Sequence, residues 1–170
     1  MRSSRGLSLV ATLAAIAVLA GGAANARADG DPASDVLLFA DIFLPYNAPS
    51  SPTIQTALWH TVVVAKKKHY RVKVAVIGSE TDLGAVPSLM GKPQTYARFL
   101  GAEIQLPAKV RLLVVMPNGF GLLHAKTAKE RRALKGISIG AGTDGLVRAA
   151  TTAVRKLAAA TGHRLPAAAG

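Results

Sequence analysis

Apolar and polar residues alternate in blocks along the chain, and most blocks have the period of a strand or of a helix. Residues 36–44 (VLLFADIFL), 71–78 (RVKVAVIG) and 110–116 (VRLLVVM) are short apolar runs, and a proline follows the first and the third. Such runs predict buried strands. The Val-rich end of the second is typical of a parallel sheet that is covered on both faces. A fourth, short strand is expected at 137–139.

Between these runs, apolar residues recur every three or four positions, which is the spacing of one buried helix face. Helix-start and helix-stop signals agree with this spacing, among them a proline after Ser51, a Thr-x-x-Glu capping box at Thr127 and a glycine at 162. Residues 79–92 are expected to form a long loop. Helices are therefore predicted at 51–68, 93–104, 127–135 and 144–161.

Strands and helices alternate along the chain, which predicts an α/β fold. We expect a single three-layer α/β/α domain with a small, mainly parallel sheet of three or four strands and right-handed crossovers. Its length of 170 residues is that of one domain. The predicted division is a signal peptide at 1–28, a linker at 29–35, the α/β domain at 36–162 and a disordered tail at 163–170.

The first 28 residues have the three parts of a secretory signal peptide. A basic start (Met1 to Arg5) precedes an apolar run at 7–20, and two small-x-small cleavage sites follow, ending at Ala26 and Ala28. This pattern predicts an extracytoplasmic protein, periplasmic or secreted. The alternative is an uncleaved membrane anchor, because residues 6–26 carry no charge and about 20 such residues span a bilayer.

Composition narrows the classes of function. The chain has no Cys, which excludes disulfide-linked partners, thiolate metal sites and Cys nucleophiles. Its formal net charge is +12, and removal of the leader with its three arginines leaves 18 basic and 9 acidic residues, or +9. This charge favours an anionic membrane, a cell-wall surface or an envelope protein as partner. Nucleic acid is disfavoured as a partner, because only 5% of residues are aromatic and the Lys and Arg residues are scattered along the chain.

Candidate site residues follow the predicted strands, because ligands of open α/β sheets bind outside the carboxyl ends of the strands. Glu80 and Asp82 lie in the loop after the second strand, and Asp41 lies near the end of the first. Three carboxylates at one edge are a candidate Ca²⁺ or Mg²⁺ site. The alternative is that Thr81 and Asp82 cap a local turn. No other cofactor is predicted.

Five polar residues near the same loops are candidate ligand-binding residues. Three of them have a structural alternative: Tyr96 as a half-buried core residue, Lys92 as a solvated lysine and Asn118 as part of an Asn-Gly turn. Lys66, Lys67 and Lys68 end the first helix, where cations offset the partial negative charge of free carbonyl groups; contact with an anionic surface is the alternative. The five candidates are Ser79, Thr81, Lys92, Tyr96 and Asn118.

No motif in the chain defines an enzyme class. Residues 140–145 read G-x-G-x-x-G, but no acid follows them to bind a ribose, so we interpret them as a glycine-rich turn before the last helix. The sequence has no H-E-x-x-H, no G-x-S-x-G and no Walker A motif. A binding or accessory protein is therefore favoured. The alternative is a weak metal-dependent phosphohydrolase with Asp82 and Glu80 as ligands.

Several segments, taken together, resemble a family of uncharacterised exported bacterial proteins. They are DIFLPY at 41–46, TDLG at 81–84, GKPQ at 91–94 with the following YA and FL pairs, and VVMPNG at 114–119. More distantly, the layout resembles the TPM domain, with ISIGAG at 137–142 and residues 97–101 in the places of its glycine segment and its helix core. The resemblance implies an accessory factor of the envelope or lumen, and the phosphatase activity and cation binding claimed for some TPM proteins.

Overall fold

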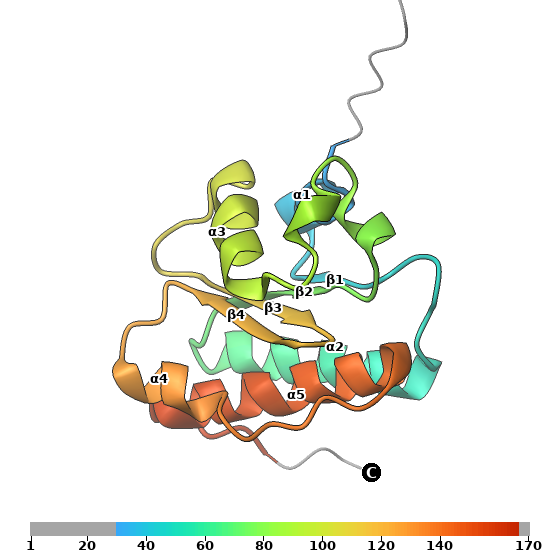
Figure 1. Cartoon of the computed structure of the whole chain (residues 1–170). Helices are drawn as coiled ribbons and strands as arrows, with labels where there is room; N and C mark the ends of the chain where they lie inside the picture. The colour runs from blue at the N-terminus through green and yellow to red at the C-terminus, as the bar shows by residue number, and fades with distance from the viewer. Residues whose placement is uncertain (1–29, 167–170) are drawn as a thin grey trace, which may run out of the picture.

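A four-stranded sheet lies between two layers of helices in the computed structural model, which describes residues 30–166 (Figure 1). The strands are β1 (Ile42–Phe43), β2 (Val72–Val76), β3 (Arg111–Met116) and β4 (Gly119–Leu123), in that order across the sheet. β1, β2 and β3 are parallel, and β4 is antiparallel to β3. The predicted α/β/α domain with a small, mainly parallel sheet is therefore confirmed.

The helices divide between the two faces of the sheet. One face is covered by α2 (Pro52–Lys67), α4 (Ala128–Ala133) and α5 (Gly142–Ala160), which lie below the sheet in Figure 1. The other is covered by α1 (Pro32–Phe39), α3 (Pro93–Glu103) and two short 3₁₀ helices, η1 (Glu80–Leu83) and η2 (Pro87–Leu89). Within 30–166, no helix is long and apolar enough to cross a bilayer.

β3 forms the centre of both cores, because all six of its residues are buried. Its side chains alternate between the faces, as the period of a strand requires. Leu113 and Val115 pack with α2 and α5, while Leu112 and Val114 pack with α1 and α3. In β2, Val74 and Val76 pack on the α2–α5 face and Ala75 on the other, so the prediction that the Val-rich end of this strand is buried on both faces is correct.

The two parallel crossovers differ in hand. α2 connects β1 to β2 over one face of the sheet, and α3 connects β2 to β3 over the other. Since both crossovers advance in the same direction across the sheet on opposite faces, one of them is left-handed. Our expectation of two right-handed crossovers is therefore wrong for one of them. A strand–helix–strand pattern does not reveal which face the helix covers.

The first predicted strand is wrong over most of its length. Residues 36–39 belong to α1, which also occupies 32–35 of the expected linker, and only Ile42 and Phe43 pair with β2. The side chain of Asp31 caps the helix by accepting the Ala33 N–H at 3.0 Å, and Pro32 occupies the first turn. This is the helix-start signal that we recognised at Ser51-Pro52, and it outweighs the β preference of the apolar run.

The fourth predicted strand is also wrong. Residues 137–139 are not a strand, and the fourth strand is β4, which pairs with β3 through a two-residue turn of Pro117 and Asn118. The glycines at 119 and 121 mask β4 in the sequence, since glycine lowers strand propensity. The expected loop at 79–92 contains η1 and η2.

The other helices agree with prediction to within a few residues. α2, α3, α4 and α5 correspond to the four predicted helices, and Gly162 follows the last with a φ of 87°. After α5, the His163 N–H donates to the Ala158 carbonyl at 2.9 Å, and Leu165 packs against the α2–α5 core. The predicted signal peptide and anchor lie outside the described residues.

Candidate functional site

The carboxyl ends of β1, β2 and β3 meet at one edge of the sheet, as the sequence predicts. A cleft of about 490 Å³ opens there, which we call the strand-end cleft. It is lined by residues that follow each parallel strand and by the segment that leads into α5. The lining residues include Pro45, Gly78, Ser79, Asp82, Pro117, Gly140, Gly142 and Thr143.

Asp82 is buried in the wall of this cleft, and its carboxylate is occupied by its own loop. One oxygen, Oδ2, accepts the N–H groups of Gly78 and Ser79 at 2.8 and 2.9 Å and lies 3.3 Å from the Ser79 hydroxyl. Only 3% of the residue is exposed. The geometry therefore gives Asp82 the turn-capping role, which was the alternative to a metal ligand.

Asp41 lies far from Asp82. Its carbonyl accepts the N–H of Val74, whereas Asp82 accepts the N–H of Gly78, which lies four residues further along the chain. This separation is roughly 13 Å along a strand. Asp41 precedes β1 rather than following it, because the strand starts at Ile42.

Asp41 instead pairs with two lysines. Its carboxylate lies 2.9 Å from Lys66 Nζ and 3.5 Å from Lys73 Nζ. Partial burial acts to raise the pKa of Asp41, but the Lys66 hydrogen bond and the Lys73 charge outweigh it and lower the pKa. Glu80 is exposed on η1. Across residues 30–166, no three His, Asp or Glu side chains form a metal-binding group, so the predicted trio is not brought together.

Tyr96 is fully buried between α3 and α1. Its hydroxyl lies 2.7 Å from both carboxylate oxygens of Asp31. Burial raises the pKa of Asp31, although the Tyr96 hydroxyl and the Ala33 N–H act in the opposite direction. Burial and the hydrogen bond to Asp31 also raise the pKa of Tyr96. Tyr96 thus joins two helices rather than lining the cleft.

Of the five predicted ligand-binding residues, Ser79 alone is among the residues that line the strand-end cleft. Asn118 donates from Nδ2 to the Gly91 carbonyl at 2.6 Å, which ties the β3–β4 turn to the loop before α3. Lys92 donates to the Ser88 carbonyl at 3.0 Å, and Thr81 is exposed on η1. Structural contacts therefore account for Asn118 and Lys92.

The G-x-G-x-x-G segment forms the tight turn into α5. A Cβ on Gly145 would overlap the Gly140 carbonyl, and Gly142 has a φ of 67°. The Asp144 carboxylate in the first turn of α5 accepts the Ser51 N–H at 2.7 Å. These contacts agree with a structural turn, which is how we interpreted the motif.

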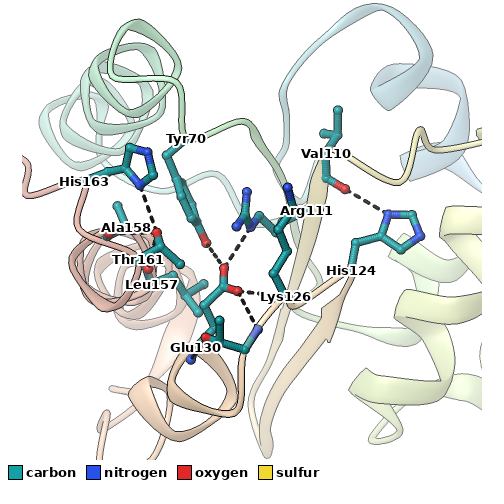
Figure 2. Close-up of polar contacts among 11 residues, drawn as sticks. Tyr70, Val110, Arg111, His124, Lys126, Glu130, Leu157, Ala158, Thr161 and His163 are labelled. Carbon is teal, nitrogen blue, oxygen red and sulfur yellow. Dashed lines mark hydrogen bonds and ion pairs between the residues drawn. The ribbon is translucent and has the colours of Figure 1, made fainter.

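A buried acid–base cluster lies on the α4–α5 side of the sheet (Figure 2). Glu130, which is fully buried, accepts from Arg111 Nε at 2.8 Å and from the Tyr70 hydroxyl at 3.3 Å. Its second oxygen accepts the N–H groups of Lys126 and Thr127, which completes the predicted capping box. The Arg111 guanidinium also stacks 4.4 Å from the centre of the Tyr70 ring. This cluster fixes α4 to β3.

The inward direction of Glu130 sends its helical neighbours outward. Lys129 and Arg132 lie on the exposed side of α4 and face Lys156 of α5, with Lys135 just beyond α4. These four cations surround a shallow groove of about 480 Å³, whose other lining residues are alanines. We call it the basic groove. The groove brings together basic residues from two separate helices of the sequence.

The sequence contained part of the signal for this groove. Lys129 and Arg132 are three residues apart in a predicted helix, so they share a face. The packing of α4 against α5, which adds Lys156, could not be inferred from spacing. Burial makes the exposed surface more basic than the composition indicates. Three acids of the described chain, Asp31, Asp82 and Glu130, are buried, whereas Arg111 is its one buried basic residue.

Three comparisons with known proteins found no relative of this chain. The chain matches no protein-family model, no curated protein and no solved structure.

Proposed function

We propose that the protein is a non-enzymatic accessory domain of the cell envelope that binds anionic surfaces through the basic groove. The observation that supports this most directly is the set of four exposed cations around one concavity. None of the four forms an ion pair with an acid in the part of the chain that the structure describes. Each is free to meet an external anion.

The binding free energy that four cations can contribute fits reversible attachment to an anionic surface. A Lys or Arg close to an anionic membrane contributes about 1 kcal/mol, so four contribute roughly 4 kcal/mol at low salt. Exposed charges are screened over about 10 Å at 0.1 M salt. Binding through the groove should therefore weaken as salt rises.

The runner-up function, a metal-dependent phosphohydrolase, has less support from the geometry. It requires Asp82 and Glu80 as metal ligands. The Asp82 carboxylate already accepts two backbone hydrogen bonds, and Glu80 is exposed on η1. No observation on the described residues favours this function over surface binding.

The test compares two triple variants of equal net charge. Lys129→Glu, Arg132→Glu and Lys156→Glu reverse the groove, whereas Lys92→Glu, Arg98→Glu and Lys109→Glu reverse exposed cations of α3 and its flanking loops. Co-sedimentation with vesicles of phosphatidylglycerol and phosphatidylcholine measures binding at several salt concentrations. We expect the groove variant to bind at least tenfold more weakly, with a two- to threefold loss in the α3 variant. Equal losses in the two variants, or binding indifferent to salt, would refute the proposal.

A further inference from the structure

A second surface gathers the exposed aromatic side chains of the described residues at the β1 edge of the sheet. Tyr46 and Trp59 are 66% and 63% exposed and line a groove of about 590 Å³. Val36 of α1 lines the same groove, and Phe39, 94% exposed, lies one turn further along that helix face. We call Phe39, Tyr46 and Trp59 the aromatic patch.

The exposure of three aromatic side chains on one surface indicates a site where a binding partner covers them. Only 5% of the chain is aromatic, so three exposed aromatic residues at one edge are a large share. Burial of a large apolar side chain is worth about 1.5 to 3 kcal/mol, and contiguous exposed apolar surface marks interaction sites. Exposure of Phe39, Tyr46 and Trp59 therefore marks the patch as an interaction site.

Lysines lie at one end of the patch. Trp59, Val63 and Lys66 recur on one face of α2, and Lys67 and Lys68 follow at its exposed C-terminal end. Lys66 pairs with Asp41, two residues after Phe39. The surface thus combines an apolar part with a cationic border.

We infer that the aromatic patch docks into the interface of a membrane that contains anionic lipids. Aromatic side chains favour the level of the headgroups, and surface-bound elements combine them with Lys residues that meet anionic lipid. The apolar rings suit the boundary of the acyl chains, and Lys67 and Lys68 suit the lipid phosphates. This inference rests on the proposed function, since it names the surface as lipid.

Two other occupants fit less well. An extended peptide would have to add to β1, but β1 pairs over only two residues, and Pro45 has no N–H to donate. A second copy of the chain would bring 21 bases against nine acids, and so few carboxylates for the lysines. Lipid phosphate supplies the missing negative charge.

The aromatic patch and the basic groove are built from different residues. The groove beside the patch lies along β1 and α2, whereas the basic groove lies between α4 and α5, and the two have no lining residue in common. The two inferences can be tested by separate variants.

Trp59 is the only Trp of the chain, so its fluorescence reports on the patch directly. The full-length exported protein is titrated with phosphatidylcholine vesicles, with and without phosphatidylglycerol, and with vesicles of brominated lipid. We expect a blue shift and bromine quenching on the anionic vesicles. Phe39→Ser with Tyr46→Ser should weaken this partitioning at least tenfold. Lys67→Gln with Lys68→Gln should weaken it more than the charge-matched Lys109→Gln with Lys126→Gln.

Each outcome separates the two proposals. Unshifted, unquenched Trp59 emission on vesicles that still co-sediment the protein overturns the docking inference and leaves the basic groove intact. A blue shift that grows with protein concentration in the absence of lipid identifies a second copy as occupant, and also overturns it. Retention of the Trp59 shift in the groove variant supports docking, whether or not the groove itself binds.

Discussion

At the scale of single residues, Glu130 organises a surface that it does not itself reach. Its carboxylate neutralises the buried Arg111, caps α4 and accepts the Tyr70 hydroxyl. Burial and the nearby Glu130 charge raise the pKa of Tyr70, so the phenol stays neutral and available as a donor. This one inward side chain thereby holds α4, and with it Lys129 and Arg132 of the basic groove, against β3.

Loss of Glu130 should be strongly destabilising. Glu130→Ala leaves Arg111, whose side chain is 6% exposed, charged and without its partner. Removing one member of a buried ion pair costs about 3 to 5 kcal/mol. Urea denaturation measures this, with the exposed Glu103→Ala as the matched control and an expected change within about 0.5 kcal/mol.

The double variant Glu130→Leu with Arg111→Met tests whether the cost arises from the orphaned charge. Apolar replacement of both partners removes the desolvation penalty, so stability should recover by at least about 2 kcal/mol relative to Glu130→Ala. A double variant no more stable than the single one would show that the capping hydrogen bonds carry the effect instead.

Asp31 should give the fold a pH dependence of known sign. Its pKa is raised in the folded protein, mainly by burial, so the native state binds a proton more tightly than the unfolded chain does. Stability therefore falls as pH rises from the ordinary value of about 3.9 through the folded pKa. Asp31→Asn keeps an oxygen for the Ala33 N–H and the Tyr96 hydroxyl but removes the charge.

We expect Asp31→Asn to be at least as stable as the parent chain at pH 7, with the difference shrinking to near zero below about pH 4. Thermal or urea unfolding between pH 3 and 8 measures this difference. Asp41, whose pKa is lowered, acts with the opposite sign in both proteins and cancels in the comparison. A variant less stable at pH 7 than at pH 4, relative to the parent, would contradict the sign.

Sequence reasoning located the residues of the strand-end cleft better than it assigned their roles. Asp82 and Ser79 lie where a strand-end loop was expected, but the direction of a carboxylate depends on which N–H groups its loop presents. Asp41 was misplaced because a nine-residue apolar run fits both a strand and a helix followed by two strand residues. Periodicity cannot separate these cases at that length.

At the scale of elements, α3 and β4 interlock through two glycines. A Cβ on Gly121 of β4 would overlap the Pro93 carbonyl at the start of α3, and one on Gly101 of α3 would overlap the Leu123 side chain. β4 was missed because glycine is a weak strand former. The same glycines allow the helix to approach closely, so what masked the strand also explains its packing.

Gly121→Ala should therefore destabilise the domain by about 1 to 3 kcal/mol, because the added methyl meets backbone that cannot rotate away. Gly78→Ala is the control, since its Cβ would lie 3.5 Å from the nearest atom, an ordinary contact. Chemical denaturation of both variants gives the comparison. Equal stability of the two would mean that α3 shifts without cost.

At the scale of the whole molecule, stability should follow the order of the strands. β3 lies inside the sheet with six buried residues, whereas β1 is an edge of two residues. Regions with many buried contacts open only with the whole fold, and edges open locally. Hydrogen exchange should therefore be slowest in residues 111–116 and fastest, among the strands, in 42–43. Protection of β1 equal to that of β3 would contradict this order.

The division of the helices was the part of the architecture that the sequence did not reveal. Alternation predicted a covered sheet, and the sheet is covered. The face of each crossover depends on how α2 and α3 pack against side chains distant in the chain, which spacing does not encode.

The position of α5 constrains when the domain can fold. This last helix supplies Leu146, Val147, Ala150, Val154 and Leu157 to the core beneath the sheet. Until residue 160 has left the ribosome, α2 covers this face of β2 and β3 without its main partner helix, and apolar surface stays exposed. The chain thus reaches its native state only after synthesis is almost complete, and a truncated product that ends before α5 should aggregate instead of folding.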